Sequence, residues 1–347
     1  MTRKRVIAVW FAYSSVSTLS GAGWVGASTC AACHPAQARR QAVTGHAGAL
    51  RRASDHPLSD LFFREREKTR QPGFRFEFLQ GPLVRVSGAG AAVDVSIQWA
   101  FGAGDQAVTF VSRVDRRNYV ELFFSYYRAM HGLAATPGQQ DLKPAGLGEA
   151  VGLYYKTRDP ALGIDGCFAC HSTGPIKFDA DGSIRPRELG VRCEDCHGPG
   201  ESHVAAAKRR DPATRRLIDN PGQWSPERQV ELCGKCHRAP RAPSGEIDFN
   251  YPWNIRHQPP YLIRSACFLR TGSLSCVTCH EPHEPINKTA SSYNQKCGVC
   301  HRQTPQACGG NCVDCHMPRV SPQPPLRFTN HWIGVYRSAN KLRPLEH

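Results

Sequence analysis

The sequence has no apolar run long enough to cross a bilayer as a helix. Its N-terminal run, Val6 to Tyr13, is well short of the roughly 20 residues that such a span needs. Acidic residues are also scarce, because 29 aspartates and glutamates stand against 44 lysines and arginines, which leaves a formal net charge of +15. A membrane span is therefore not expected, whereas the basic surplus needs an explanation, since it is typical of proteins that bind nucleic acids or membrane surfaces.

Cysteine, by contrast, is abundant, and 14 of the 16 cysteines belong to one repeated unit, Cys-x-x-Cys-His. The seven copies are Cys30, Cys33 and His34; Cys167, Cys170 and His171; Cys193, Cys196 and His197; Cys233, Cys236 and His237; Cys276, Cys279 and His280; Cys297, Cys300 and His301; and Cys312, Cys315 and His316. Two thiols at this spacing add to the two vinyl groups of one haem, and the adjacent histidine ligates the iron. The sequence therefore predicts seven covalently bound haem c groups, with the motif histidines as proximal ligands.

Zinc knuckles or disulfides are the alternative interpretation of Cys-x-x-Cys. A zinc site usually needs a second ligand pair at an ordered distance. These copies are odd in number, and each carries a histidine directly after its second cysteine. Successive motif histidines from His171 to His316 are separated by 26, 40, 43, 21 and 15 residues, which is too irregular for a solenoid with a fixed repeat. Haem attachment is therefore the better interpretation.

Haem attachment also accounts for the basic surplus. If a leader containing Arg3, Lys4 and Arg5 is removed, the formal charge falls to +12, and seven haems add fourteen propionates. The holoprotein is then expected to lie near neutrality before the iron charges are counted. We therefore expect no nucleic-acid partner.

The first residues are typical of a secretory leader, with basic residues, an apolar run and then small residues. Cleavage after Ala22 fits best, and cleavage after Ala27 is the alternative. An uncleaved anchor is a weaker interpretation because the apolar run is short. Export agrees with haem attachment to cysteine, which in bacteria takes place outside the cytoplasm. We therefore expect a periplasmic or extracellular protein with no stable membrane span after cleavage.

Four segments are expected along the chain. They are a leader, 1–22; a first haem site with a short helix that carries His46, 23–72; a β-rich insert, 73–150; and a six-haem cluster with a C-terminal wrap, 151–347. In the insert, apolar and polar residues alternate in short runs between Phe74 and Phe124. This pattern predicts a small antiparallel β-meander of about five strands near 73–127.

The rest of the chain is rich in residues that interrupt regular structure, with 31 glycines and 26 prolines. A basic helical stretch is expected from Glu201 to Ile218. Because seven haems leave fewer than about fifty residues for each cofactor, porphyrin faces should replace much of the usual apolar core. The predicted fold is mostly irregular backbone plus short α-helices organised around haems, as in multihaem cytochromes c.

Several strings extend beyond the shared motif. They are Trp24 to His34 followed by a histidine about a dozen residues on, Cys170-His171-Ser-Thr-Gly174, and Val191 to Gly-Pro-Gly200-Glu-Ser-His203. These strings resemble the cytochrome c-552/4 family. Cys279-His280-Glu-Pro-His283 and Cys315-His316-Met-Pro318 look like the downstream part of larger members of the same multihaem superfamily, in which octahaem tetrathionate reductase and hydroxylamine oxidoreductase are more distant relatives. The resemblance covers 24–53 and about 164–335.

The resemblance implies that His203 and His283 are distal ligands, each of a haem other than that of the motif it follows. His46 and His331 occupy places where relatives also carry distal ligands. Seven irons would need three more ligands, for which His131 and His257 are candidates, with His56 or Met130 as the last. Cys267 and Cys308 belong to no motif, and one disulfide between them is expected in an oxidising compartment.

The leading functional hypothesis is electron transfer through closely spaced haems, most of them with two histidine ligands, because a saturated iron cannot bind substrate. Its partners would be other redox proteins, such as cytochromes and quinol-oxidising or terminal reductase complexes. The alternative is a multihaem oxidoreductase in which one open-site haem acts on a small nitrogen or sulfur compound. The chain has no Cys-x-x-Cys-Lys motif of the kind nitrite reductases use, which argues only partly against this alternative. A filament-forming haem wire is a third class, without a sequence signal.

We predict that the intact mass of the exported protein exceeds that of the processed polypeptide by seven haems, because each motif holds one covalently. Mass spectrometry under denaturing conditions measures this directly. A surplus of six haems or fewer, or bound zinc, would contradict the prediction.

Overall fold

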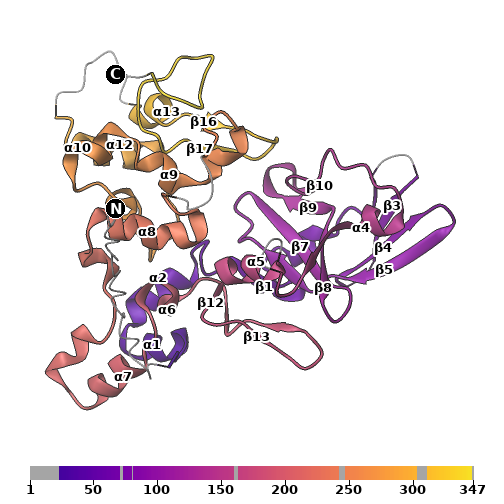
Figure 1. Ribbon diagram of the computed structural model, residues 1–347, viewed down its shortest axis with the longest axis horizontal. Coiled ribbons are helices and arrows are strands. Elements are labelled where there is room, and N and C mark those ends of the chain that lie inside the picture. The colour runs from indigo at the N-terminus through magenta and orange to yellow at the C-terminus, as the bar shows by residue number, and fades with distance from the viewer. Residues whose placement is uncertain are drawn as a thin grey trace, which may run out of the picture.

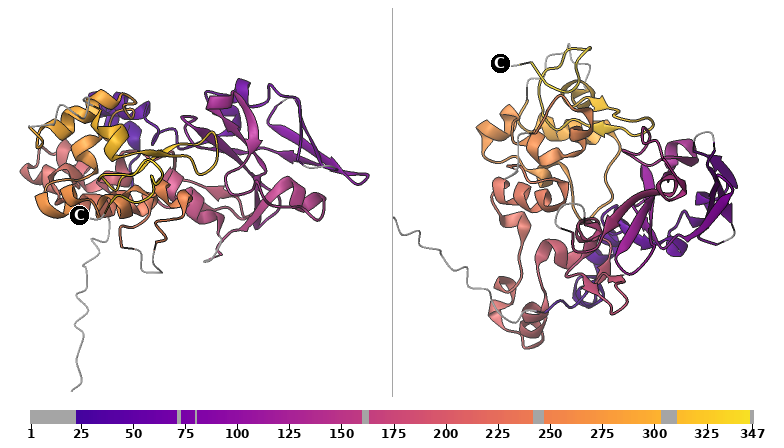
Figure 2. Two further views of the ribbon diagram at one scale, coloured as in Figure 1. Left: turned by 90° about the horizontal axis from the view of Figure 1, so that it is seen from above. Right: turned by 45° about the vertical axis from the view of Figure 1, so that its right-hand side comes forward.

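The computed structural model describes residues 23–70, 73–79, 81–159, 163–241, 247–302 and 311–345. The expected leader, 1–22, lies outside the described residues. The chain forms two parts that lie side by side, one made of short helices and one made of β-strands (Figures 1 and 2). The chain enters the β-rich part after its first two helices and returns to the helical part through α5 (Ile164–His171).

The β-rich part holds two antiparallel sheets. The smaller sheet has the order β2-β3-β4-β5, and the larger one has the order β1-β6-β7-β8-β11, with β9 paired to β7 and β10 to β9. The strands are β1 (Leu50–Arg52), β2 (Glu67–Thr69), β3 (Arg75–Leu79), β4 (Leu83–Gly88), β5 (Ala91–Ser96), β6 (Trp99–Phe101), β7 (Ala107–Arg113), β8 (Asn118–Leu122), β9 (Phe124–Tyr127), β10 (Gly132–Ala135) and β11 (Gly152–Lys156). Short helices η1 (Ala53–Asp55), α3 (Ser59–Phe62), η2 (Arg128–Met130) and α4 (Leu147–Val151) connect them.

The alternating residues form strands as predicted, but the segment is not one meander of about five strands. Phe76, Phe78, Val84 and Val86 are buried together in one apolar cluster, as period-2 alternation requires. The strand expected to end at Phe124 is broken, because the Phe123 N–H donates to the Val151 carbonyl (2.9 Å) and the chain changes partner there. The three residues of β6 are all buried, so they show no alternation from which the strand could be predicted.

A second apolar cluster fastens α5 to the larger sheet. The Phe168 ring, which lies between the two cysteines of the second motif, is fully buried. It meets the rings of Trp99 and Phe101 edge-on, with centroids 5.2 and 5.1 Å apart. The β-rich part therefore fixes the position of this motif through an ordinary apolar core.

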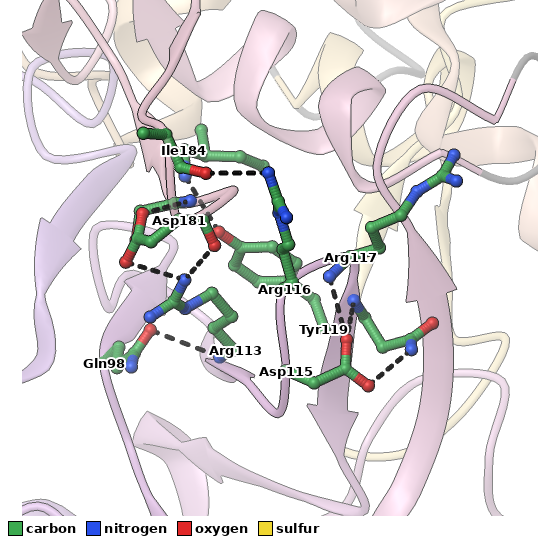
Figure 3. A network of polar contacts seen from close by, with 11 residues as sticks. Gln98, Arg113, Asp115, Arg116, Arg117, Tyr119, Asp181 and Ile184 are labelled. Carbon is green, nitrogen blue, oxygen red and sulfur yellow. Dashed lines mark hydrogen bonds and ion pairs between the residues drawn. The ribbon is translucent and has the colours of Figure 1, made fainter.

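A polar network attaches the hairpin of β13 (Lys177–Phe178) and β14 (Ile184–Arg185) to the same sheet (Figure 3). Arg113 forms an ion pair with Asp181 (2.9 Å) and donates to its carbonyl (2.8 Å). The Ile184 N–H donates to the Tyr119 hydroxyl (2.9 Å). Another short strand pair, β12 (Ser172–Thr173) with β15 (Glu188–Leu189), continues the chain from α5.

The helical part consists of short elements separated by irregular backbone. They are α1 (Ala27–Cys33), α2 (Pro35–Ala42), α6 (Cys193–His197), α7 (Glu201–Lys208), η3 (Pro212–Arg216), η4 (Pro221–Gln223), α8 (Pro226–His237), η5 (Pro252–Arg256), α9 (Gln258–Leu262), α10 (Ala266–Thr271), α11 (Cys276–Cys279), α12 (Ala290–Gly298) and α13 (Cys312–His316). A last strand pair, β16 (Arg319–Val320) with β17 (Phe328–Thr329), forms part of the C-terminal wrap.

Two helix predictions are wrong in detail. The helix expected to carry His46 ends at Ala42, and His46 lies in the turn that follows. The Thr44 hydroxyl there donates to the Gln41 carbonyl (2.8 Å), which favours a turn over another helical residue. The basic helix expected over 201–218 stops at Lys208, because Arg210 adopts a left-handed backbone (φ 57°) and a new 3₁₀ helix begins at Pro212.

Both apolar clusters of the described residues lie in or against the β-sheets. The helical part contributes only scattered buried residues such as Val230, Ile255 and Tyr261. None of the helices in the described ranges is long and apolar enough to cross a membrane. The part of the chain that carries six of the seven motifs therefore lacks the apolar core that its size would call for.

We predict that Phe168→Ala destabilises the β-rich part together with the second motif, because it leaves a cavity between Trp99 and Phe101. Emptying such a site costs about 3–5 kcal/mol. Thermal unfolding followed by circular dichroism should show the loss, and Phe168→Leu should retain most of the stability. An unchanged melting curve for Phe168→Ala would refute the anchoring role.

Candidate haem-binding sites

Each of the seven motifs lies on a short helix or at its end. The first cysteine of every motif is helical, and the second cysteine and the histidine stand at or just beyond the C-terminal turn. Residues three and four apart share one helix face, so both thiols and the imidazole of a motif are presented on the same side. A planar cofactor that bonds both sulfurs can thus lie across that face, with its metal beneath the histidine.

Four histidines outside the motifs lie opposite motif histidines. The ring pairs are His34 with His203 (centroids 6.3 Å apart), His46 with His237 (6.1 Å), His197 with His283 (5.9 Å) and His280 with His331 (6.3 Å). They are the same four histidines for which a distal role is predicted from the sequence. Each pairs with a motif other than the one that it follows in the chain.

The spacing of these rings leaves room for a metal between them. Two metal–nitrogen bonds of about 2 Å, plus about 1 Å from each nitrogen to its ring centroid, give about 6 Å. The ligand axis lies in the plane of each imidazole, so the observed twists of 14°, 21°, 36° and 76° between ring planes are all compatible with one shared metal. The paired residues therefore fit a haem iron with two axial histidines.

The Nδ1 atoms of most motif histidines and of three of the four histidines opposite them have hydrogen-bond partners, which leaves Nε2 for a metal. Five bond to carbonyls: His171 to Ala49 (3.0 Å), His197 to Asp219 (2.8 Å), His203 to Thr214 (2.9 Å), His316 to Gly334 (2.9 Å) and His331 to Thr329 (2.9 Å). Three more bond to side chains: His237 to Gln258 (3.1 Å), His280 to Tyr293 (3.5 Å) and His283 to Glu281 (2.9 Å). Such contacts fix the tautomer and orientation that metal-ligating histidines require.

Burial keeps several of these imidazoles in the neutral form that binds metals. It is the main cause that lowers the pKa of His46, His171, His237 and His280, and a neighbouring histidine lowers the pKa of His46, His171 and His280 further. For His331, burial lowers the pKa to about 4. These rings are therefore unprotonated at neutral pH even before any ligand is bound.

Cysteines of different motifs contact each other. The sulfur atoms of Cys30 and Cys193 lie close enough to perturb each other's pKa, and so do those of Cys170 with Cys236 and of Cys233 with Cys276. Cys297 lies close enough to Cys279 and Cys312 to interact electrostatically with both. The edges of neighbouring sites are therefore in contact along much of the helical part.

Within the described ranges, no second histidine ring lies opposite His171, His301 or His316. His131 is exposed at the end of η2, in a left-handed conformation (φ 48°). His257 is half-buried between η5 and α9, where burial and Arg256 lower its pKa to about 4. Their roles as distal ligands stay predictions.

Two further sequence candidates can be placed. His56 is buried with both ring nitrogens in use, since Nδ1 accepts from the Leu58 N–H (3.1 Å) and Nε2 donates to the Gly102 carbonyl (3.1 Å). His56 is therefore a structural residue of the β-rich part. Met130 is exposed to 52%.

The expected disulfide concerns two cysteines outside the motifs. Cys267 lies in α10 near Cys279 and Cys297. Its expected partner Cys308 lies outside the described residues, so the disulfide stays a prediction.

The sequence did not point to a polar group that adjoins the second motif. Glu121 lies near Cys167 and accepts hydrogen bonds from Gln139 (3.0 Å) and the Tyr155 hydroxyl (3.3 Å). Arg256 also interacts with this carboxylate electrostatically. Glu121 is a charged residue between Val120 and Leu122 in an otherwise mostly apolar strand. A carboxylate at such a position is the sequence signal that could have pointed to it.

No family model matches the sequence. Among curated proteins, the chain is similar to the multihaem cytochrome MtrA of Shewanella baltica (strain OS185), with 24% identity over 181 residues. This match covers 46% of the chain and 47% of MtrA, so the chain spans about half the length of that relative.

Among solved structures, the chain is similar to the outer cell wall cytochrome OcwA, with a TM-score of 0.52 and 15% identity over 89% of this chain and 79% of that one. The fold is that of a multihaem cytochrome. The undecahaem cytochrome from the S-layer of Carboxydothermus ferrireducens gives a TM-score of 0.43 at 16% identity, over 81% of this chain and 43% of that one. The predicted multihaem cytochrome fold, with short helices and small antiparallel sheets, is confirmed.

We predict that Glu121→Gln removes a pH-dependent part of the stability of the chain. Burial raises the pKa of Glu121, so the folded state favours the protonated form. Its contribution is greatest below the ordinary carboxyl pKa of about 4.3 and is lost as the pH rises towards the raised value. Unfolding by denaturant from pH 4 to 8 should show a smaller decline for the variant than for the wild type. Parallel curves would contradict the prediction.

Proposed function

We propose that the protein is a heptahaem c-type cytochrome that transfers electrons through a chain of mainly bis-histidine haems. The observation that carries the proposal is the set of four ring pairs at metal-bridging distance. Saturated irons exchange electrons but have no position for a substrate. Similarity to multihaem cytochromes supports the same class of function.

In this proposal the haems supply one-electron redox chemistry, and the residues of the chain determine where each haem lies and how its iron is ligated. The motif cysteines hold the haem edges, and the motif histidines are the proximal ligands. His203, His46, His283 and His331 are the distal ligands of the sites of His34, His237, His197 and His280. The Nδ1 hydrogen bonds set ring orientation and basicity, which tune the reduction potential.

The contacts between motifs support a continuous path. The Cys30–Cys193 contact joins the His34 and His197 sites, and the Cys233–Cys276 contact joins the His237 and His280 sites. Cys196 lies near Cys233, which connects these two pairs. Cys297 adjoins both Cys279 and Cys312, so the path continues to the last two motifs. The Cys170–Cys236 contact supports a branch from the His237 site to the His171 site.

A second candidate function is supported by the surroundings of this branch. The His171 ring lies in the described structure without an opposing histidine, and Glu121, Tyr155 and Arg256 gather near Cys167. If the iron there keeps an open position, the protein is an oxidoreductase that acts on a small nitrogen or sulfur compound. If His257 ligates that iron, the open position is closed and the oxidoreductase function is excluded. His257 is the candidate ligand because it lies near His237 and near Arg256, which interacts with Glu121.

We further propose export to the periplasm or cell exterior, cleavage after Ala22 or Ala27, and other redox proteins as partners, such as cytochromes and quinol-oxidising or terminal reductase complexes. The similar structures come from an outer cell wall cytochrome and an S-layer cytochrome, which agrees with export. Assignment to the cytochrome c-552/4 family in particular rests on the motif strings alone.

The test of function mixes the fully reduced holoprotein with possible oxidants in a stopped-flow spectrometer. Reoxidation only by cytochromes or ferric acceptors is expected for an electron carrier, together with a spectrum dominated by low-spin haem. Rapid, saturable reoxidation by nitrite, hydroxylamine or tetrathionate would favour the oxidoreductase instead.

We predict that His203→Ala converts one low-spin haem to high-spin, because it removes the ligand opposite His34. His203→Met should keep that haem low-spin with an altered spectrum, since a thioether can also ligate iron. Glu201→Gln, on the same helix, is the matched control and should leave the spin state unchanged. Electron paramagnetic resonance of the oxidised proteins measures the number of high-spin haems. An unchanged spectrum for His203→Ala would refute the assignment of His203 as the distal ligand opposite His34.

A further inference from the structure

A dense group of cations lies beside the His34 site. Five exposed residues at the end of α7 and along η3 form what we call the α7–η3 basic patch: Lys208, Arg209, Arg210, Arg215 and Arg216. In the described structure, none of their side chains forms an ion pair. Five unpaired positive charges within nine residues generate a strong local field unless something neutralises them.

The nearby carboxylates are engaged elsewhere. Asp211 caps η3 by accepting from the Ala213 N–H (2.8 Å). Glu201 accepts from the Gly23 N–H (2.7 Å), and Asp219 lies 3.8 Å from Arg228. Even if Asp211 and Glu201 are counted against the five cations, the hairpin of α7 and η3 keeps a net positive charge.

The patch belongs to the same hairpin that holds a candidate iron ligand. The Thr214 carbonyl, between the two halves of the patch, accepts from His203 Nδ1 (2.9 Å). The His203 ring faces His34. Leu217, next to the patch, is exposed to 38%. The His34 site is thus bordered by cations and a small apolar surface, an arrangement typical of short-lived charge-steered contacts between proteins.

Haem propionates do not account for the whole patch. One haem brings two carboxylates, whereas the patch has five cations. The complete molecule is expected to lie near neutrality once fourteen propionates offset its basic residues. The positive charge at α7 and η3 is therefore a local feature and not a share of a uniformly basic surface.

We propose that the α7–η3 basic patch is the docking surface for an acidic redox protein that exchanges electrons with the His34 site. The inference rests on the proposed electron-transfer function. One electron passes from the reduced partner to the oxidised iron of this site, so the partner is oxidised, the iron is reduced, and no bond forms or breaks. Transient redox complexes are small and gain speed from charge complementarity.

The experiment measures the second-order rate at which a reduced acidic flavodoxin reduces the oxidised holoprotein, over a range of salt concentrations. The test variant combines Lys208→Gln, Arg209→Gln and Arg215→Gln. The matched control combines Arg64→Gln, Arg66→Gln and Lys143→Gln, which are exposed cations of the β-rich part, at the opposite end of the molecule from α7 (Figure 1). Reduction by dithionite and the haem spectrum are recorded for all three proteins.

We expect the wild-type rate to fall as salt increases, because screening weakens the attraction. The test variant should be at least about tenfold slower at low salt and less sensitive to salt, while the control stays within about twofold of the wild type. Dithionite reduction and the spectra should be the same in all three proteins, which shows that the haem sites are intact.

Several outcomes overturn the proposal. Equal losses in the test and control variants, or a wild-type rate that does not fall with salt, would mean that the patch does not guide docking. If the test variant is reduced more slowly by dithionite as well, to the same extent, the patch attracts small anions and not a protein partner. If the test variant loses binding to phosphatidylglycerol vesicles without a change in the rate with flavodoxin, the patch binds a membrane surface. Failure of dithionite to reduce the wild type would instead refute the electron-transfer function itself.

Discussion

The architecture of the helical part depends on histidines that face one another from distant places in the chain. His34 faces His203, His46 faces His237 and His280 faces His331. Each pair closes a long loop, and closing loops of this length costs conformational entropy. The helices themselves are short, and the described residues of this part form no apolar cluster of the size found in the sheets. If each pair shares an iron, metal–ligand bonds replace apolar burial as the main force that closes these loops.

The β-rich part obeys the more familiar rule. Its rings of Phe76, Phe110 and Phe124 are buried in one cluster, so this part has an apolar core of its own. The two parts therefore have different origins of stability, and α5 belongs to both. Phe168 sits in the apolar core, Cys167 packs against that core, and the His171 ring lies edge-on to Phe101. The β-rich part is thus expected to hold the His171 site in place even before its haem is attached.

The sequence was informative where chemistry fixes spacing. The motifs could be found because haem attachment sets their spacing. The candidate histidines His46, His203, His283 and His331 followed from the resemblance to multihaem cytochromes, and the structure brings these four rings opposite motif rings. Local structure was harder to predict, because tertiary contacts decide it. Phe123 breaks a strand by bonding Val151, and the helix before His46 ends in a turn held by Thr44. His56 packs against Phe62 and has both ring nitrogens occupied, which no spacing reveals.

On the electron path proposed above, the His34 site and the His171 site differ in what surrounds them. The His34 site lies beside the α7–η3 basic patch, whereas the His171 site lies against the larger sheet and near the half-buried Glu121. Among described residues, Cys170 of the His171 site lies close to Cys236 of the His237 site. An electron that arrives at the His34 site would pass the His197 and His237 sites before it could turn towards His171. The β-rich part therefore adjoins a branch of the path, where it can alter the chemistry of one site without interrupting transfer along the others.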